Sequence, residues 1–566
     1  MKLKLIFFFT LIITSAFAQL DFGGEKKFTK ADTLRGTLSP MRTCYTVKEY
    51  DLDVHVDIDH KYISGSNTIR FAVAQNFKKL QIDLFANMNI DKIEYNGEEL
   101  KYTREYNAVF VEFPDTLKQG SVHSFIVYYS GNPQPAKHAP WDGGFSWNTD
   151  NGNPFVGVSC QGTGASLWWP CKDHQSAEPA AMSISVTVPP GLDEVSNGRL
   201  VKKTVQPDGW TTFEWRVTSP INNYDVTLNI AKYRYFSDTY YNPAYSKDTL
   251  TLDYYVLPEN YEKAQKQFAQ VKPMMDCFYK LFGEYPFVRD GYKLVEAPYL
   301  GMEHQSCVEY GNKYQNGYLG VSRTEHKFDF IIIHESVHEW WGNSITTNDV
   351  ADMWIHEGFA TYAEALYIEC LYGHDAYMDY INSEKKSVSN DKPITGIYGV
   401  NEEGSSDMYS KGALLLHTIR SIMDDDAKFF AILKGIQEKF KYQTVNSVDI
   451  EKYISEQSGI DFSEIFDRYL HYAAIPKLLI SCSQQGDDLR IVYKYILPEK
   501  SKFAMPVKIT VEKGKYDFII PTEKLQVMTL KNMSVADLQV ATDLFYITTD
   551  ISVTHPDESQ RKTIKK

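Results

Sequence analysis

The chain has 566 residues, enough for roughly three or four domains of ordinary size. Hydrophobic residues make up 43% of it and charged residues 23%, and its mean hydropathy is −0.36. These values exclude a mainly disordered chain and a protein with many membrane-spanning helices. The 59 basic and 73 acidic residues give a net charge of −14, which argues against a nucleic-acid-binding protein that relies on phosphate attraction.

The first 18 residues have the pattern of a secretory signal peptide. Lys2 and Lys4 form a basic start, residues 5–13 form an apolar core, and residues 16–18 (Ala-Phe-Ala) form a small-residue cleavage site. The apolar core is too short to span a bilayer, and no later run reaches about 18 apolar residues. We therefore expect an exported protein, periplasmic or extracellular, with no membrane anchor after signal cleavage.

Residues 19–257 are predicted to form an antiparallel β domain. Short runs rich in β-branched and aromatic residues, such as 52–58 and 182–188, alternate there with Gly, Pro and Asn. This spacing of strands and turns is typical of a sheet in which successive strands pair with their neighbours.

Residues 258–473 are predicted to form a mainly helical domain. The stretch 259–282 has a helical apolar period, although Pro273 should kink or break it. Strand patterns then return, so residues 474–556 are predicted to be a small β domain, followed by a polar tail at 557–566.

Seven cysteines are too few for a disulfide scaffold, and an odd number leaves at least one thiol unpaired within a monomer. Cys160 and Cys171 are close enough in sequence to bridge in an oxidising compartment, although connectivity cannot be deduced from sequence alone. The chain has no Cys-x-x-Cys pair, which disfavours a zinc site made of cysteines.

The segment HESVHEWWGN, residues 334–343, carries the most specific chemical pattern in the chain. His334 and His338 are four residues apart, so on a helix their imidazoles project from one face and can bind one zinc ion. Glu335, next to the first histidine, is suitably placed to take a proton from a water on the metal.

A catalytic zinc ion needs a third protein ligand and an open position for water. Eighteen residues separate His338 from Glu357, which lies early in a second helical stretch, 352–371. Gly342 and Asn343 supply a turn, so the two helices can pack antiparallel and bring Glu357 to the metal. One zinc ion per chain, held by two histidines and a glutamate, is the thermolysin-type arrangement.

Residues 299–411 resemble the zinc aminopeptidases of the aminopeptidase N and leukotriene-hydrolase family, whose pattern is HExxH, eighteen residues, then the glutamate of an EGFATY segment. A second family signature, GxMEN, is matched in its Gly-Met-Glu core by Gly301, Met302 and Glu303. The resemblance implies that Glu303 binds the α-ammonium group of a peptide. It also implies that the neighbouring residues of the motif, including His304, contact the substrate.

Two further positions match this family. Tyr409, in Tyr-Ser-Lys-Gly, corresponds to the tyrosine of the family's YxKG motif, which implies a hydrogen bond to the developing oxyanion. Gln161 looks like the β-domain glutamine or glutamate that helps to hold the amine, although the residues after it follow the family pattern only partly. His304 and His356 stand where the family usually has Asn.

The resemblance implies a multidomain α+β fold, with an N-terminal antiparallel β domain, a thermolysin-like, mainly helical catalytic domain and a small C-terminal β-sandwich domain. It implies a zinc-dependent aminopeptidase that acts on peptides with a free N-terminus, with Glu335 moving the proton. The family's large helical C-terminal domain has no counterpart in this sequence. We therefore expect an open cleft and a weak dependence of cleavage on peptide length.

Two other interpretations remain open. A thermolysin-like endopeptidase would use the same zinc site and Glu335, but it would be indifferent to N-acetylation of the peptide, and Glu303 and Gln161 argue against it. An inactive exported peptide-binding protein would keep the fold, yet the predicted zinc ligands and Glu335 are all present.

Overall fold

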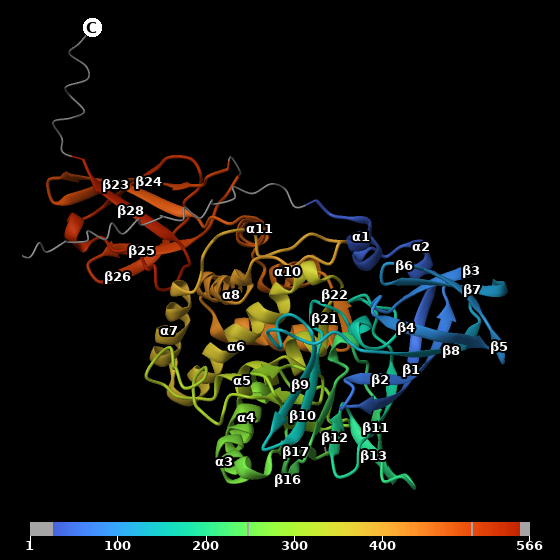
Figure 1. Cartoon of the computed structure of the whole chain (residues 1–566). Helices are drawn as coiled ribbons and strands as arrows, with labels where there is room; N and C mark the ends of the chain where they lie inside the picture. The colour runs from blue at the N-terminus through green and yellow to red at the C-terminus, as the bar shows by residue number, and fades with distance from the viewer. Residues whose placement is uncertain (1–26, 246–247, 500–501, 555–566) are drawn as a thin grey trace, which may run out of the picture.

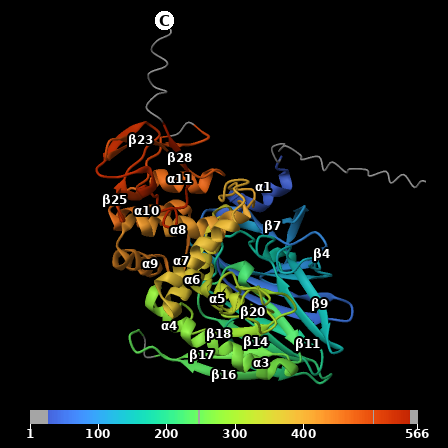
Figure 2. The same ribbon diagram turned by 90° about the vertical axis from the view of Figure 1, so that its left-hand side faces the viewer.

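The computed structural model describes residues 27–245, 248–499 and 502–554. The predicted signal peptide and polar tail therefore lie outside the described residues. An N-terminal group of β-sheets is followed by a helical region and then by a C-terminal group of β-sheets (Figure 1). In both views the N-terminal sheets lie to one side of the helices and the C-terminal sheets lie above them (Figures 1 and 2). Within the described ranges, no helix is long and apolar enough to cross a membrane.

Two short helices, α1 (Lys30–Gly36) and α2 (Pro40–Thr43), precede three N-terminal sheets. The largest sheet has the order β13-β14-β11-β1-β2-β8-β4-β5. Its strands are β1 Tyr45–Asp57, β2 Tyr62–Val73, β4 Met88–Tyr95, β5 Glu98–Glu99, β8 Val122–Gly131, β11 Ala181–Val188, β13 Arg199–Val205 and β14 Thr211–Val217. The other two sheets have the orders β12-β15-β10-β9 and β3-β7-β6. Their strands are β3 Phe77–Asp83, β6 Lys101–Glu105, β7 Ala108–Leu117, β9 Gly144–Asp150, β10 Asn153–Ser159, β12 Asp193–Ser196 and β15 Leu228–Ala231.

Strand β1 illustrates why these residues form a half-buried sheet. Its side chains alternate between exposed and buried, with Tyr50, Leu52 and Val54 in the core. The predicted antiparallel β domain is confirmed, with one exception in its pairing: β1 runs parallel to β11. A parallel pair needs a long crossover, and the chain between these two strands supplies it by forming β2 to β10.

The helical region begins with a five-stranded sheet of order β16-β17-β18-β20-β19. Its strands are β16 Arg234–Tyr240, β17 Leu250–Val256, β18 Tyr292–Glu296, β19 Gly301–Met302 and β20 Val308–Tyr310. Because β16 pairs with β17 and β17 pairs with β18, this sheet continues across the domain boundary that the sequence places at residue 257. Strand β19 is at the edge of the sheet, so one side of its backbone is free of strand partners within the described structure.

The α-helices that follow α2 lie between residues 261 and 471. They are α3 Tyr261–Gln267, α4 Val271–Leu281, α5 Phe330–Val337, α6 Trp354–Tyr372, α7 His374–Ser383, α8 Ser410–Met423, α9 Asp426–Phe440, α10 Ser447–Ser458 and α11 Ser463–His471, joined by a small parallel pair, β21 Ile345–Thr347 and β22 Gln443–Val445. The predicted break near Pro273 is confirmed: a 3-10 turn at Phe268–Gln270 separates α3 from α4. Pro273 then lies in the first turn of α4, where its missing N–H costs little.

The C-terminal region has a four-stranded sheet of order β27-β24-β23-β28 and a two-stranded sheet, β25-β26. The strands are β23 Lys477–Gln485, β24 Asp488–Ile496, β25 Val507–Glu512, β26 Lys515–Ile519, β27 Gln526–Leu530 and β28 Thr548–Val553. The two sheets lie one over the other (Figures 1 and 2). Their buried side chains join those of the preceding helices in one hydrophobic cluster, whereas the N-terminal sheets have a cluster of their own.

The possible bridge between Cys160 and Cys171 does not form; both are free thiols, buried in the N-terminal core. The disulfide joins Cys277 of α4 to Cys370 of α6 instead. These two residues are 93 positions apart in sequence, but helix packing brings their Cα atoms to 6.0 Å, a distance that a disulfide can span.

Candidate active site

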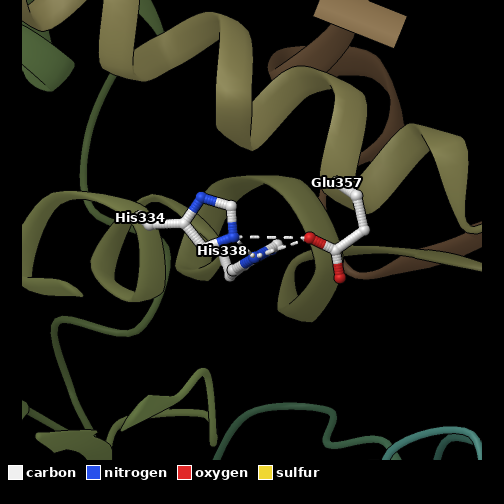
Figure 3. A group of neighbouring side chains, drawn as sticks. All are labelled: His334, His338 and Glu357. Carbon is white, nitrogen blue, oxygen red and sulfur yellow. Dashed lines mark hydrogen bonds and ion pairs between the residues drawn. The ribbon is translucent and has the colours of Figure 1, made fainter. Parts of the chain in front are cut away.

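Three side chains of the helical region converge on one point (Figure 3). His334 lies in α5, His338 caps the end of that helix, and Glu357 lies in the first turn of α6. The two Nε2 atoms are 3.4 Å apart, and Oε2 of Glu357 lies 3.4 Å from Nε2 of His334 and 3.6 Å from Nε2 of His338. Ligand atoms bound tetrahedrally at 2.0–2.2 Å are separated by about 3.3–3.6 Å. The three residues therefore fit a tetrahedral Zn²⁺ with one open position.

Each of the two histidines is oriented by a second contact. Nδ1 of His334 lies 2.7 Å from Oε1 of Glu364, and Nδ1 of His338 lies 2.9 Å from the carbonyl oxygen of Trp341. These bonds fix the ring tautomers and leave both Nε2 atoms facing Glu357. Burial disfavours the charge on Glu357, but His338 and His334 beside it hold the pKa of this carboxyl well below its usual range.

Glu335 faces the same point from α5. One carboxylate oxygen of Glu335, one of Glu303 and a ring nitrogen of His338 lie within 4.8 Å of one another. Burial raises the pKa of Glu335 to about 8. A Cβ on Gly301 would lie 2.6 Å from Cγ2 of Ile331 and 3.0 Å from Oε1 of Glu335, so glycine lets edge strand β19 pass this close to α5.

Gln161 reaches the same place from the N-terminal sheets. Its Nε2 donates a hydrogen bond to Oε1 of Glu303 and lies 3.5 Å from Oε1 of Glu357. Nδ2 of Asn343 donates to the backbone carbonyl of Glu303 at 2.6 Å. Burial raises the pKa of Glu303. The structure thus brings together two residues, 142 positions apart in sequence, that the sequence places at the substrate amine.

Tyr409 completes the group of predicted residues. It directly precedes α8, and its ring stacks against the imidazole of His334 with the centroids 6.0 Å apart. Burial raises the pKa of its hydroxyl well above the usual range, so the hydroxyl remains a hydrogen-bond donor. Met302, Gly301 and Tyr409 all line one cavity of about 780 Å³ together with the three metal-facing side chains.

Comparison with known proteins identifies the family of this chain. Residues 260–469 match the peptidase family M1 domain, and residues 46–224 match the peptidase M1 N-terminal domain. The chain belongs to peptidase family M1. This M1 peptidase is 21% identical over 82% of its length to tricorn protease-interacting factor F2 of Thermoplasma acidophilum. It is 25% identical over 70% of its length to the leucyl aminopeptidase of Saccharolobus solfataricus.

The chain spans about half the length of these relatives, 58% of the first and 50% of the second. Among solved structures, a mutant M1 zinc metallopeptidase from Deinococcus radiodurans, bound to a Tyr-Ser-Ala substrate, has a TM-score of 0.64. That likeness has 21% sequence identity and covers 77% of this chain and 96% of the other. It shows that the two proteins share a fold.

His304 and His356 replace the family's Asn residues, and in this M1 peptidase both contact other protein groups. His304 is fully buried with Nδ1 3.1 Å from Oε2 of Glu309, and it is not among the residues that line the cavity. The predicted substrate contact of His304 is therefore not seen, because its side chain points away from Glu303 into the protein. Nε2 of His356 accepts the backbone N–H of Thr347 at 3.0 Å, which fixes the turn before α6.

Several cavity residues of this M1 peptidase were missed by the sequence analysis. Glu364 orients His334, and its position seven residues after Glu357, two turns along α6, is a signal that could have found it. Glu384 pairs with Arg323 at 3.2 Å, and burial raises the pKa of Glu384 to about 7. Glu403 lies near Gln161, and burial together with the charge of Glu357 raises its pKa to about 7. No sequence motif marks Glu384, Arg323 or Glu403.

Proposed function

We propose that this protein is a zinc-dependent aminopeptidase that removes the first residue of peptides with a free N-terminus. The observation that carries the proposal is the contact between Gln161 and Glu303 beside the metal-facing residues. Nε2 of Gln161 donates to Glu303 and lies 3.5 Å from Oε1 of Glu357. A buried carboxylate at this place favours an ammonium group, whereas a blocked N-terminus would leave it unpaired at a cost of several kcal/mol. Neither the endopeptidase nor the inactive binding protein has an observation in its favour.

The roles of the residues follow from their positions. His334, His338 and Glu357 would hold Zn²⁺, which would supply Lewis acidity at the scissile carbonyl and lower the pKa of water. Glu335 accepts the proton of the attacking water and returns it to the leaving amine nitrogen. The hydroxyl of Tyr409 donates to the oxyanion, a contact typically worth about 3–4 kcal/mol.

The test compares one peptide in its free and N-acetylated forms, incubated with the purified protein and followed by mass spectrometry with and without a chelator. The expected result is stepwise loss of single residues from the free form only, abolished by the chelator. Internal cuts in both forms would show an endopeptidase instead. No cleavage of either form by protein with confirmed zinc would support an inactive binding protein.

We also propose that the protein is exported to the periplasm or the medium. The signal-peptide pattern of residues 1–18 supports export, and so does the disulfide between Cys277 and Cys370, because such bonds persist in oxidising compartments. Cell fractionation and the intact mass of the purified protein test this. A cytoplasmic protein that retains residues 1–18 would contradict it.

A further inference from the structure

The glutamates that line the cavity differ in whether a neighbouring side chain already holds them. Six face it: Glu303, Glu335, Glu357, Glu364, Glu384 and Glu403. Four of these have hydrogen-bond or ion-pair partners. Glu335 and Glu403 have no hydrogen-bond or ion-pair partner among the described residues, although the charge of Lys392 acts on Glu403 from beyond ion-pair distance. Since Glu335 is the proposed general base, Glu403 is the remaining carboxylate without a partner in that part of the chain.

Glu403 lies beside the site proposed for the substrate amine. Its Oε1 is 2.7 Å from the position that a Cβ on Gly162 would occupy. Gly162 has a φ of +66°, in the left-handed region that favours glycine, and it directly follows Gln161. The carboxylate of Glu403 therefore lies against the backbone of Gly162, and the residue before it, Gln161, holds Glu303.

The segment that carries Glu403 is fixed in place. Nδ2 of Asn401 donates to the carbonyl oxygen of Gly162 at 2.9 Å, and the backbone N–H of Ile397 donates to Glu402 at 3.0 Å. Oδ2 of Asp349 accepts the backbone N–H of Gly399 at 2.8 Å. The carboxylate is thus presented to the cavity by a loop that is tied to both the N-terminal sheets and the helical region.

We propose that Glu403 binds the cationic side chain of an N-terminal lysine or arginine, so that the enzyme prefers peptides that begin with a basic residue. This inference rests on the proposed function. An α-ammonium group held by Gln161 and Glu303 places the Cα atom of the first substrate residue beside the same loop. A lysine side chain reaches roughly 6 Å from its Cα atom, over five bonds of about 1.5 Å each. An unpaired carboxylate in a cavity favours such a cation over an apolar side chain.

The first experiment measures kcat/KM for arginyl, lysyl and methionyl aminocoumarin substrates. The matched variants are Glu403→Gln and Glu402→Gln, because the adjacent Glu402 does not line the cavity. We expect the wild type to favour the basic substrates at least tenfold. Glu403→Gln should lower the ratio of arginine to methionine rates roughly ten- to a hundredfold, and Glu402→Gln should keep the wild-type ratio. An unchanged ratio in Glu403→Gln would overturn the proposal.

The second experiment does not depend on turnover. Calorimetry compares the binding of free L-arginine with that of L-citrulline, its neutral isostere, to the zinc-loaded protein. Arginine should bind at least tenfold more tightly to the wild type, and Glu403→Gln should abolish the difference. Equal affinities in the wild type, or equal weakening of both amino acids by the variant, would contradict the inference. Discrimination without turnover of any substrate would support it and refute the proposed function.

Discussion

The metal-facing side chains and the wall that closes the cavity beside them are built in different ways. His334, His338 and Glu357 come from one short stretch of chain, and each histidine has a second partner that sets its orientation. The wall around Gln161 and Glu403 comes from segments far apart in sequence. It is held chiefly through the carbonyl oxygen of Gly162, which accepts hydrogen bonds from distant side chains.

This difference separates two properties of the enzyme. The metal site depends on two packed helices, α5 and α6, and on contacts within them. Recognition of the substrate depends on how the N-terminal sheets and the 397–404 loop meet, because each contributes one acidic or amide group. Changes on one side should therefore affect metal binding and proton transfer, and changes on the other should affect substrate affinity.

The largest expected effect is that of Glu335→Gln. Removal of the general base should lower kcat by about 10²- to 10⁴-fold, while the three metal-facing residues remain intact. The measurement combines kcat on an aminocoumarin substrate with zinc content by mass spectrometry. A variant that lost its zinc together with its activity would show that Glu335 serves the metal site and not the proton transfer.

Glu364→Gln should affect the metal more than the substrate. It removes the carboxylate that binds Nδ1 of His334, and such orienting groups contribute about 10- to 100-fold to metal affinity. Competition with a zinc chelator measures this affinity. Tyr380→Phe is the milder control, because Tyr380 only donates a hydrogen bond to Glu364. Equal zinc affinities in wild type and Glu364→Gln would refute the orienting role.

Arg35→Ala tests the opposite wall. The guanidinium of Arg35 donates from Nη2 to the carbonyl of Gly162 at 2.9 Å, a bond to a charged donor worth about 1.5–3 kcal/mol. Without this bond Gln161, the residue before Gly162, should be less firmly positioned. We therefore expect KM to rise about three- to tenfold with zinc content unchanged. If kcat fell while KM stayed constant, the wall would not be a separate unit.

The smallest effect on activity concerns the junction of the two regions, where Oε1 of Glu178 accepts a hydrogen bond from Thr346 at 2.7 Å. Burial raises the pKa of Glu178 from its ordinary 4.5 to about 7. The folded protein therefore binds an extra proton between pH 4.5 and 7, and its stability falls as the pH rises across that range. Glu178→Gln removes this loss and should stabilise the protein at pH 8, by no more than about 3 kcal/mol.

Denaturant unfolding at pH 5 and pH 8 measures this change. At pH 5 the wild-type carboxyl is already protonated in the folded state, so the variant should gain much less there. A gain of equal size at both pH values would mean that the hydrogen bond to Thr346, rather than the buried charge, sets the difference.

The metal site was predictable because the HExxH motif places both histidines on one helix. The third ligand, Glu357, lies in the first turn of the next α-helix, α6. Pro273 was informative for the same reason, since its effect on a helix is local. The disulfide was not predictable: Cys277 and Cys370 meet only because α4 packs on α6. Glu403 was missed because its place depends on Gly162, a residue in another domain.

His304 shows the limit of reasoning from a motif alone. Its neighbour Glu303 lines the cavity, whereas His304 does not. The substitution of Asn by His at this position is accommodated by the buried carboxylate of Glu309. The side chain of Glu309 also accepts hydrogen bonds from Tyr299 and Thr227.

The active centre is shared between two hydrophobic cores. Met302 packs into the core of the N-terminal sheets, whereas Ile331, Ile332 and Ile333, just before His334, pack into the core of the catalytic helices. If the core of the N-terminal sheets unfolds while that of the helices stays folded, the protein should keep its metal but no longer bind the N-terminus of a peptide. Zinc retention alone is therefore a poor sign of an intact enzyme after storage or heating. In a competent preparation both hydrophobic cores must be intact, so the two should unfold in a single thermal transition.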